Sequence, residues 1–138
     1  MARYERVNLD GKSITESRVS AAAVLPGQGL VITGKKFVAP TADVKQQLYI
    51  ANVAHLQGLT ADDEIPAGDT IEGEYLETGR DVAALVAATV VVDKDTPLTI
   101  GADGYLKLTT IAGEAIVAYS QEALTVGDSA ELVWVRGA

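Results

Sequence analysis

Short runs of apolar residues separated by turn residues dominate the chain from about residue 29 onward. Two hairpins stand out: one has strands at 30–33 and 37–39 around "GKK", and the other has strands at 98–100 and 105–108 around "GADG". Glycine-containing turns of this length between β-branched and aromatic residues are typical of β-hairpins. The pattern therefore predicts a mainly β domain.

Two more strands are indicated after each hairpin. "QQLYIANVAHL" is apolar enough for a buried strand and "TIEGEYLET" alternates along its length, and "GEAIVAYSQEAL" and "SAELVWVRG" repeat these features near the C-terminus. The order of hairpin, buried strand, loop, Gly-Asp and final strand thus occurs twice. We interpret this as two similar halves, at about 26–79 and 93–138, with chance recurrence of common turn residues as the alternative.

A Gly-Asp pair precedes the final strand of each half, as Gly68-Asp69 and Gly127-Asp128. A glycine at positive φ, followed by an aspartate that accepts a bond from a backbone N–H two residues on, makes a turn that sets the register of the next strand. We expect all four residues to be structural. Replacing either aspartate with alanine is then expected to cost about 1 kcal/mol of stability.

The segment 81–95, "DVAALVAATVVVDKD", is ambiguous. Its first part has helical spacing after a good N-cap, Asp81, whereas Val90, Val91 and Val92 favour a strand. We expect one or two helical turns at most, followed by a strand.

Residues 1–25 are polar and carry no sustained period. A short helix over 15–25 and an extended arm are the alternatives, and Pro26-Gly27 favours the arm because it would stop a helix at once. The sequence thus predicts a small β-barrel or β-sandwich built from two similar halves. It forms a single β domain at 26–138, with an extended N-terminal arm at 1–25 and at most one short helix.

Composition narrows the function. The chain of 138 residues has no cysteine, a single histidine (His55) and a net charge of −8, with no run of basic residues among aromatics, so nucleic acid is not an expected partner. No apolar stretch approaches the ~20 residues of a membrane span, and the N-terminus lacks the apolar core of a signal peptide. We therefore expect no membrane partner and a chain that stays on the side of the membrane where it is made.

Acidic residues are concentrated in the segment 62–81, where eight carboxylates accompany the single basic residue Arg80. A hard cation could use such oxygens, but the carboxylates lack the alternate spacing around a glycine turn that calcium loops use, and a solvated acidic face is favoured. The sequence has no nucleophile motif that could use His55 as its base, and no glycine-rich loop of the kind that binds phosphate. We expect no enzyme, no metal and no cofactor, with a metal-dependent enzyme as the alternative.

The last 45 residues or so contain "PLTIGADGYL", then "GEAIVAYSQEALTVGD", then a final strand ending at the basic residue Arg136. These segments, together with "IPAGDTIEGEYLETG", resemble the small capsid decoration (cement) proteins of tailed bacteriophages. The resemblance covers about two thirds of the chain and leaves the first 25 residues unmatched.

The resemblance implies a β-rich structural virion protein on the outer surface of an expanded icosahedral capsid. Such a protein, made in the host cytoplasm, would bind the major capsid protein as a homotrimer, with a dimer as alternative, and would hold neighbouring subunits together against the pressure of packaged DNA. The arm could add a strand to an exposed sheet edge of the capsid protein. The candidate contact residues are Arg3, Tyr4, Arg6, Val7, Lys12 and Arg18. A β-sandwich binding module for carbohydrates or cell surfaces is the alternative function.

Overall fold

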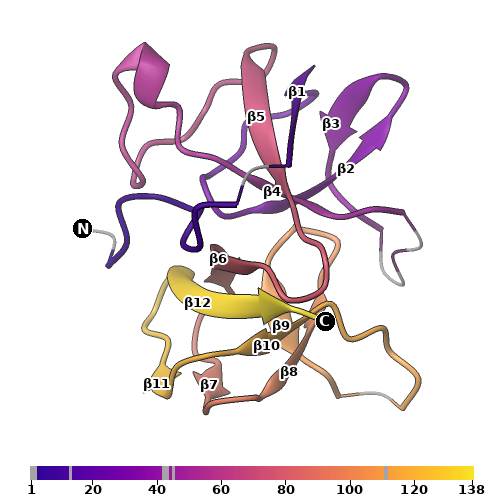
Figure 1. Cartoon of the computed structure of the whole chain (residues 1–138), viewed down its shortest axis with the longest axis vertical. Coiled ribbons are helices and arrows are strands. Elements are labelled where there is room, and N and C mark those ends of the chain that lie inside the picture. The colour runs from indigo at the N-terminus through magenta and orange to yellow at the C-terminus, as the bar shows by residue number, and fades with distance from the viewer. Residues whose placement is uncertain (1–2, 13, 42–43, 45, 111) are drawn as a thin grey trace.

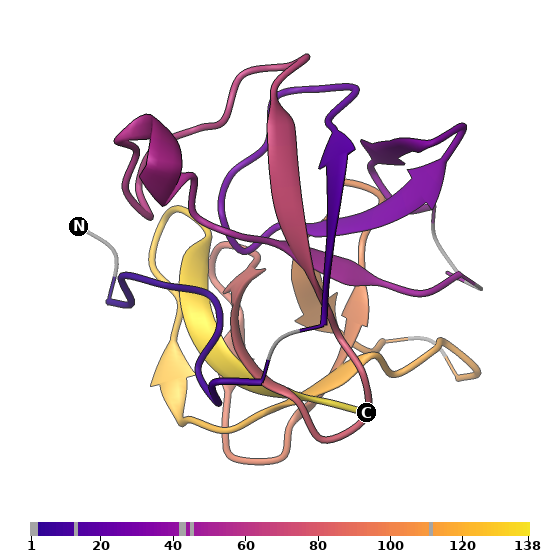
Figure 2. The same cartoon turned by 45° about the horizontal axis from the view of Figure 1, so that its top comes forward.

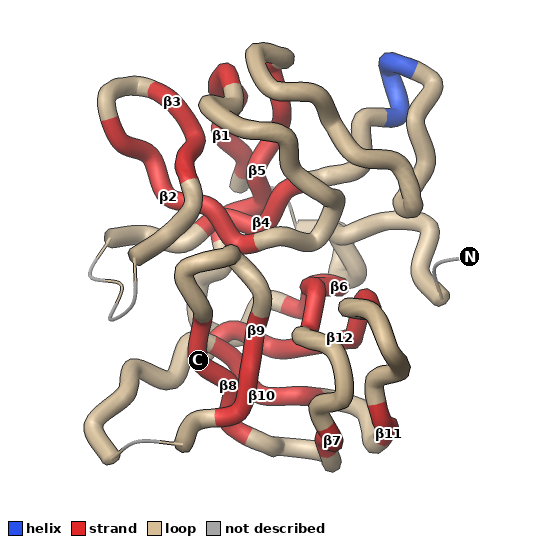
Figure 3. The backbone as a smooth tube through the Cα atoms, turned by 180° about the vertical axis from the view of Figure 1, so that it is seen from behind, coloured by secondary structure: helices blue, strands red, loops and turns tan. Residues whose placement is uncertain are grey.

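Two β units stacked on one another make up the computed structural model, which describes residues 3–12, 14–41, 44, 46–110 and 112–138. Figure 1 shows the unit containing β1 to β5 above the unit containing β6 to β12. Figure 3 shows the single helical turn of the described residues, the 3-10 turn η1 at His55–Gln57. No helix in these residues is long and apolar enough to cross a membrane. The prediction of a mainly β fold with at most one short helix is confirmed.

The first unit is a five-stranded sheet in the order β1-β5-β4-β2-β3. Its strands are β1 (Thr15–Val19), β2 (Gly29–Thr33), β3 (Lys36–Val38), β4 (Tyr49–Ala51) and β5 (Thr70–Tyr75). The two outer strands meet at one point, where Ser20 forms a parallel bridge with Phe37 and the Ala21 amide donates to the Phe37 carbonyl at 3.0 Å. The sheet therefore curls almost into a barrel.

The second unit is a closed barrel in the order β6-β12-β10-β8-β9, with β9 returning to β6. Its strands are β6 (Asp81–Val86), β8 (Pro97–Ile100), β9 (Leu106–Leu108), β10 (Ala118–Ser120) and β12 (Glu131–Gly137). A two-stranded sheet of β7 (Val91–Val92) and β11 (Leu124–Thr125) lies beside it. The hairpins predicted at β2–β3 and β8–β9 are both present.

Both units have the same strand order. The strands of the second unit correspond one to one with those of the first, in the order β6, β12, β10, β8, β9 for β1, β5, β4, β2, β3. Each pairing in one unit then has a counterpart of the same direction in the other, including the parallel closure. The closing bonds also match, because the Ala87 amide donates to Leu106 at 2.9 Å as the Ala21 amide does to Phe37. The antiparallel bridge of Val24 with Ile65 corresponds to the pairing of β7 with β11. The chain is thus a tandem repeat in topology.

The repeat has different bounds from those predicted. Its halves start at β1 and β6 rather than at 26 and 93, because the first strand of each half was missed. The segment expected to form helical turns is strand β6, buried along nearly its whole length. Val82, Ala84 and Val86 face the barrel core, and Ala83 and Leu85 belong to a second cluster with Leu132. A run that is apolar on both faces satisfies helical spacing by composition alone.

The N-terminal segment packs against the domain and does not form a projecting arm. Asn8 forms an antiparallel bridge with Val82, the Ala83 amide donates to the Val7 carbonyl at 2.8 Å, and β1 pairs with β5. Figure 2 shows this indigo segment crossing the second unit before it enters β1 of the first. The boundary expected at residue 25 is therefore absent, because residues on both sides of it share the same sheets.

The interior of the first unit is closely packed at β5. A Cβ built on Gly73 would lie 2.7 Å from Cζ of Phe37 and 3.0 Å from Cβ of Tyr49, so only glycine fits there. The Phe37 and Tyr49 rings lie 5.7 Å apart between centroids.

The barrel core of the second unit extends into the first through Val31 and Ile50. One apolar cluster therefore spans both units, while the first unit keeps a separate cluster around Phe37 and Tyr49.

Candidate functional site

A buried arginine joins the N-terminal segment to β5. Arg80 has no exposed surface, and its Nη2 lies 3.1 Å from Oε2 of Glu74, itself only 3% exposed. The same guanidinium donates to the carbonyl oxygens of Tyr75 and Lys12, both at 3.0 Å, and to Oδ2 of Asp10 at 3.2 Å. We call Asp10, Glu74 and Arg80 the buried ion cluster. Each of its charges is compensated, as burial of a charge requires.

Two amides complete the surroundings of Glu74. Oε1 of Glu74 accepts a hydrogen bond from Asn52 Nδ2 at 3.0 Å and another from Asn8 Nδ2 at 3.4 Å. Oε1 and Oε2 of Glu74 are both engaged, so this carboxylate is held in a structural role. It was expected on a solvated face with Glu72, and only Glu72 is exposed.

Asp10 also receives two backbone N–H groups, from Asp81 at 2.9 Å and from Lys12 at 2.9 Å. Partial burial opposes ionisation of Asp10, but these two bonds and the Arg80 guanidinium outweigh it and hold the pKa of the carboxyl below its ordinary value. The Asp10 carboxylate therefore stabilises the fold in its charged form.

A half-open groove of about 580 Å³ lies beside this cluster. Its walls come from the N-terminal segment at Arg6–Asn8, from Ser17 of β1, from β5 and from the loop at 52–57 that contains η1. Leu56, on η1, is completely exposed at the groove. We call this feature the β5 groove.

The β5 groove contains His55, Glu72 and Glu74, the residue types from which a catalytic or metal site would be built. No group of three His, Asp or Glu side chains in the described residues is arranged to hold a metal ion. No hydrogen bond joins the His55 imidazole to a hydroxyl or carboxylate in the part of the chain that the structure describes. The groove has the mixed apolar and polar lining of a surface that binds a peptide segment or a small ligand.

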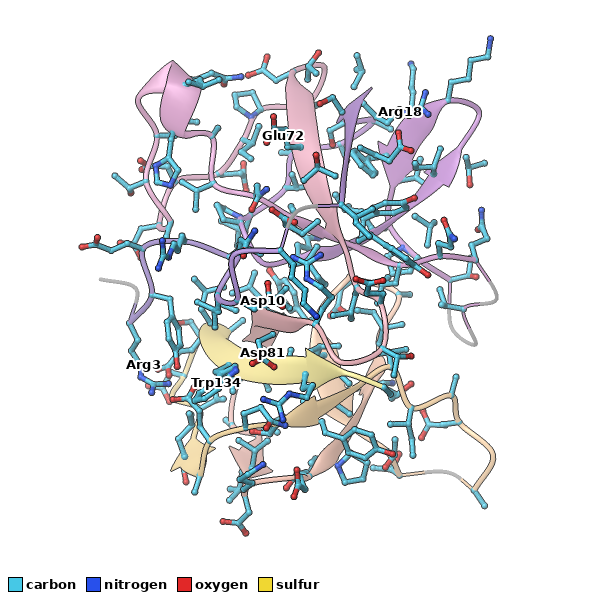
Figure 4. All side chains as sticks on the ribbon, viewed as in Figure 1. Arg3, Asp10, Arg18, Glu72, Asp81 and Trp134 are labelled. Carbon is cyan, nitrogen blue, oxygen red and sulfur yellow. The ribbon has the colours of Figure 1, made fainter. Side chains whose placement is uncertain are left out.

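The six candidate contact residues do not share one face. Figure 4 places Arg3 near Trp134 on the second unit and Arg18 at the far end of the first. Val7 was expected to contact the capsid, but it is 1% exposed and lies in the barrel core, so it is not available to a partner. Of the remaining candidates, Arg6 lies at the β5 groove, and the Lys12 carbonyl is bound by Arg80.

Arg3 and Tyr4 form a second cluster with Glu122. Arg3 Nη1 lies 3.3 Å from Oε2 of Glu122, which also accepts the Trp134 amide at 2.8 Å. Burial is the main reason that the pKa of Tyr4 is raised to about 12, and a hydrogen bond with Glu122 is the second reason. Burial opposes ionisation of Glu122, but its bonds with Arg3, Trp134 and Tyr4 outweigh it and hold the pKa of this carboxyl below its ordinary value.

The two Gly-Asp pairs differ from each other. Gly68 has φ +88°, as expected for a turn glycine, and the Asp69 amide donates to the Pro66 carbonyl at 3.3 Å. Gly127 does not have positive φ. Neither aspartate makes a side-chain hydrogen bond within the described residues. The expected bond from aspartate to backbone is therefore found in neither turn, and only the first turn has a backbone bond in its place.

Arg136, the basic residue that ends the last strand, pairs with a strand neighbour. Its Nε and Nη2 donate to the two carboxylate oxygens of Asp81 at 2.7 and 3.0 Å. Arg136 lies directly opposite Asp81 in the pairing of β12 with β6. This bidentate pair stabilises the barrel at the point where the chain enters it.

Comparison with known proteins finds similarity in fold only. No family model matches the sequence, and no curated protein matches it. Among solved structures, the chain is similar to the N base of the head fiber protein gp8.5 of bacteriophage phi29, with a TM-score of 0.55 and 15% sequence identity. The alignment covers 91% of this chain and 93% of the phage chain, so both stacked units take part in it. The chain therefore has the fold of this head fiber base.

Proposed function

We propose that this chain is a structural protein of a bacteriophage head. The observation that carries the proposal is the similarity to the phi29 head fiber base over nearly the full length of both chains. A match to part of one barrel would have little weight, since small β-barrels serve many functions. Agreement over two stacked units is more specific.

The sequence resemblance to capsid decoration proteins supports the same class of function. Its longest segment, from about residue 93 onward, falls on β8 to β12 of the closed barrel. We extend the proposal accordingly: the protein lies on the outer surface of the capsid, binds the major capsid protein and holds neighbouring subunits together. Many copies on one shell would add their weak contacts by avidity.

We assign the capsid contact to the β5 groove. Leu56 is fully exposed beside this concave surface, so a partner that fills the groove would bury its side chain. Arg6 adds a positive charge to a chain whose net charge is −8. The groove replaces the projecting arm as the contact surface, because residues 7–10 are bound to the domain.

The test is co-sedimentation of the purified protein with expanded and unexpanded heads of its parent virus. We expect binding to expanded heads and little binding to unexpanded ones. Leu56→Asp is expected to weaken binding by about tenfold or more, as the loss of an interface anchor does. Ile116→Asp is the matched control, since Ile116 is also an exposed apolar residue, 42% accessible, but belongs to the other unit.

The outcomes separate two parts of the proposal. Absence of binding to either form of the head would contradict the function itself. Binding that Leu56→Asp leaves unchanged would retain the head protein and contradict the groove as the contact surface.

A further inference from the structure

The outer edge of β1 is unpaired at Thr15 and Ser17, before β3 closes it at Ser20, although the matching edge of the other unit is covered. In each unit the first strand uses alternate residues to pair with the last strand. The Ser20 amide donates to the Asp69 carbonyl at 2.9 Å and the Tyr75 amide donates to the Ile14 carbonyl at 2.8 Å. The backbone N–H and C=O groups of the even-numbered residues in this stretch therefore face β5. The backbone groups of Thr15, Ser17 and Val19 therefore point away from β5.

The repeat shows what such an edge can bind. When Ala21 is matched to Ala87 by their closing bonds, Ser17 corresponds to Ala83 and Thr15 to Asp81. In the second unit the Ala83 amide donates to the Val7 carbonyl at 2.8 Å, and the Asp81 carbonyl accepts the Leu9 amide at 3.2 Å. The N-terminal segment thus lies antiparallel along β6 as an added strand. In the first unit, no described residue makes the corresponding bonds to Ser17 or Thr15.

The side chains on β1 are complementary to a second copy of the same strand. An antiparallel pair of β1 strands centred on Ser17 places Glu16 of each copy opposite Arg18 of the other. Opposite charges directly across an antiparallel pair are stabilising. Ser17 would exchange two backbone bonds with Ser17 of the second copy, and the Val19 amide would donate to the Thr15 carbonyl of the second copy.

Two further features of β1 fit this arrangement. Arg18 Nε is buried and has no hydrogen-bond partner among the described residues, while Arg18 Nη2 lies 3.2 Å from Oε2 of Glu16 in its own chain. Glu16 of a second copy would supply the missing acceptor. Ile14 and Val19 are large apolar side chains that are 49% and 37% exposed, and pairing would reduce this exposure.

We propose that two copies of this protein associate through an antiparallel pairing of their β1 strands about a two-fold axis at Ser17. This assigns a dimer, the alternative to the trimer that the decoration family suggests. The inference depends on the repeat and on β1, so it stands or falls separately from the function on the capsid.

The test is the mass of the protein in solution, measured by sedimentation equilibrium over a range of concentrations. Wild-type protein is expected to be in monomer–dimer equilibrium. Glu16→Arg places like charges across both pairs and is expected to raise the dissociation constant by at least about tenfold. The double variant Glu16→Arg/Arg18→Glu exchanges the charges and should restore dimerisation to within about threefold of wild type.

A backbone variant tests the strand pairing independently of charge. Ser17→Pro removes an amide that is unpaired in the monomer, so the fold should be retained, as circular dichroism can verify, while the dimer is lost. Glu64→Arg, on an exposed loop, is the matched charge control and should leave the dimer unchanged. A monomer at all concentrations, a trimer, or a dimer that neither Glu16→Arg nor Ser17→Pro weakens would overturn the proposal.

Discussion

The guanidinium of Arg80 lies 3.1 Å from the carboxylate of Glu74, and almost no part of either side chain is exposed. Through the same group Arg80 also binds Asp10 and the carbonyl of Lys12. A single buried cation thus connects the end of β5 to the segment that precedes β1. The N-terminal segment depends on this cluster for its position on the domain.

Replacing Arg80 tests that dependence. Arg80→Ala removes the cation that pairs with the buried carboxylate of Glu74 and the partly buried carboxylate of Asp10, and breaking a buried pair in this way costs about 3–5 kcal/mol. We expect a loss of this size in urea unfolding, measured at pH 7. Arg136→Ala is the control, since its ion pair with Asp81 is partly exposed to solvent and its loss should cost much less than the loss of Arg80. Equal losses for the two variants would contradict the central role of Arg80.

Gly73 tests the packing inside the first unit. Gly73→Ala places a methyl group against Phe37 and Tyr49, and overpacking of this kind costs about 1–3 kcal/mol. At Gly127, which does not have positive φ, the nearest atom to an added Cβ is 3.4 Å away, so Gly127→Ala is expected to be close to neutral. Thermal unfolding of both variants gives the comparison. A neutral Gly73→Ala would show that the ring of Phe37 moves aside freely.

The turn before β5 separates the contribution of a glycine from that of the aspartate beside it. Gly68→Ala is expected to cost about 1 kcal/mol, because a side chain at φ +88° is strained even though the space around it is open. Asp69→Ala and Asp128→Ala are expected to stay within about 0.5 kcal/mol of wild type, since neither carboxylate makes a hydrogen bond in the described residues. Chemical denaturation measures all three. A cost of 1 kcal/mol for either aspartate would restore the role that the sequence suggested.

Glu122 predicts how stability depends on pH. Its pKa is lower in the folded chain than its ordinary value of 4.5. The stability that the Glu122 carboxylate contributes to the fold is therefore fully present above pH 4.5 and is lost as the pH falls through the lower folded pKa. Glu122→Gln should therefore be less stable than wild type at pH 7, and the gap should close as the pH approaches 3. Urea unfolding at several pH values follows the gap, with Glu64→Gln as control. A gap that stays constant down to pH 3 would contradict this assignment.

The sequence predicted those parts of the fold that depend on local signals. Both hairpins were placed correctly, because glycine turns and β-branched strands lie next to one another in the chain. The repeat was recognised for the same reason, from turns and strands that recur in order. The bounds were wrong because the first strand of each half has no hairpin partner next to it in sequence.

The remaining features depend on contacts between distant residues. Asp10 and Arg80 are 70 positions apart, and the pairing of Val7 with Ala83 has a similar separation. No local pattern reports such contacts, so residues 1–25 were interpreted as a projecting arm. One signal was available for the buried ion cluster: Arg80 is the single basic residue in a segment of eight carboxylates, and a lone cation among anions is a candidate for burial with some of them.

An electron cryomicroscopy reconstruction of the parent virion would show directly whether the protein is part of the head. We predict density on the outer surface of the head that fits the two stacked units, with the β5 groove facing the major capsid protein. A complete head that carries the protein nowhere on its outer surface would contradict its proposed function as a structural protein of the capsid surface.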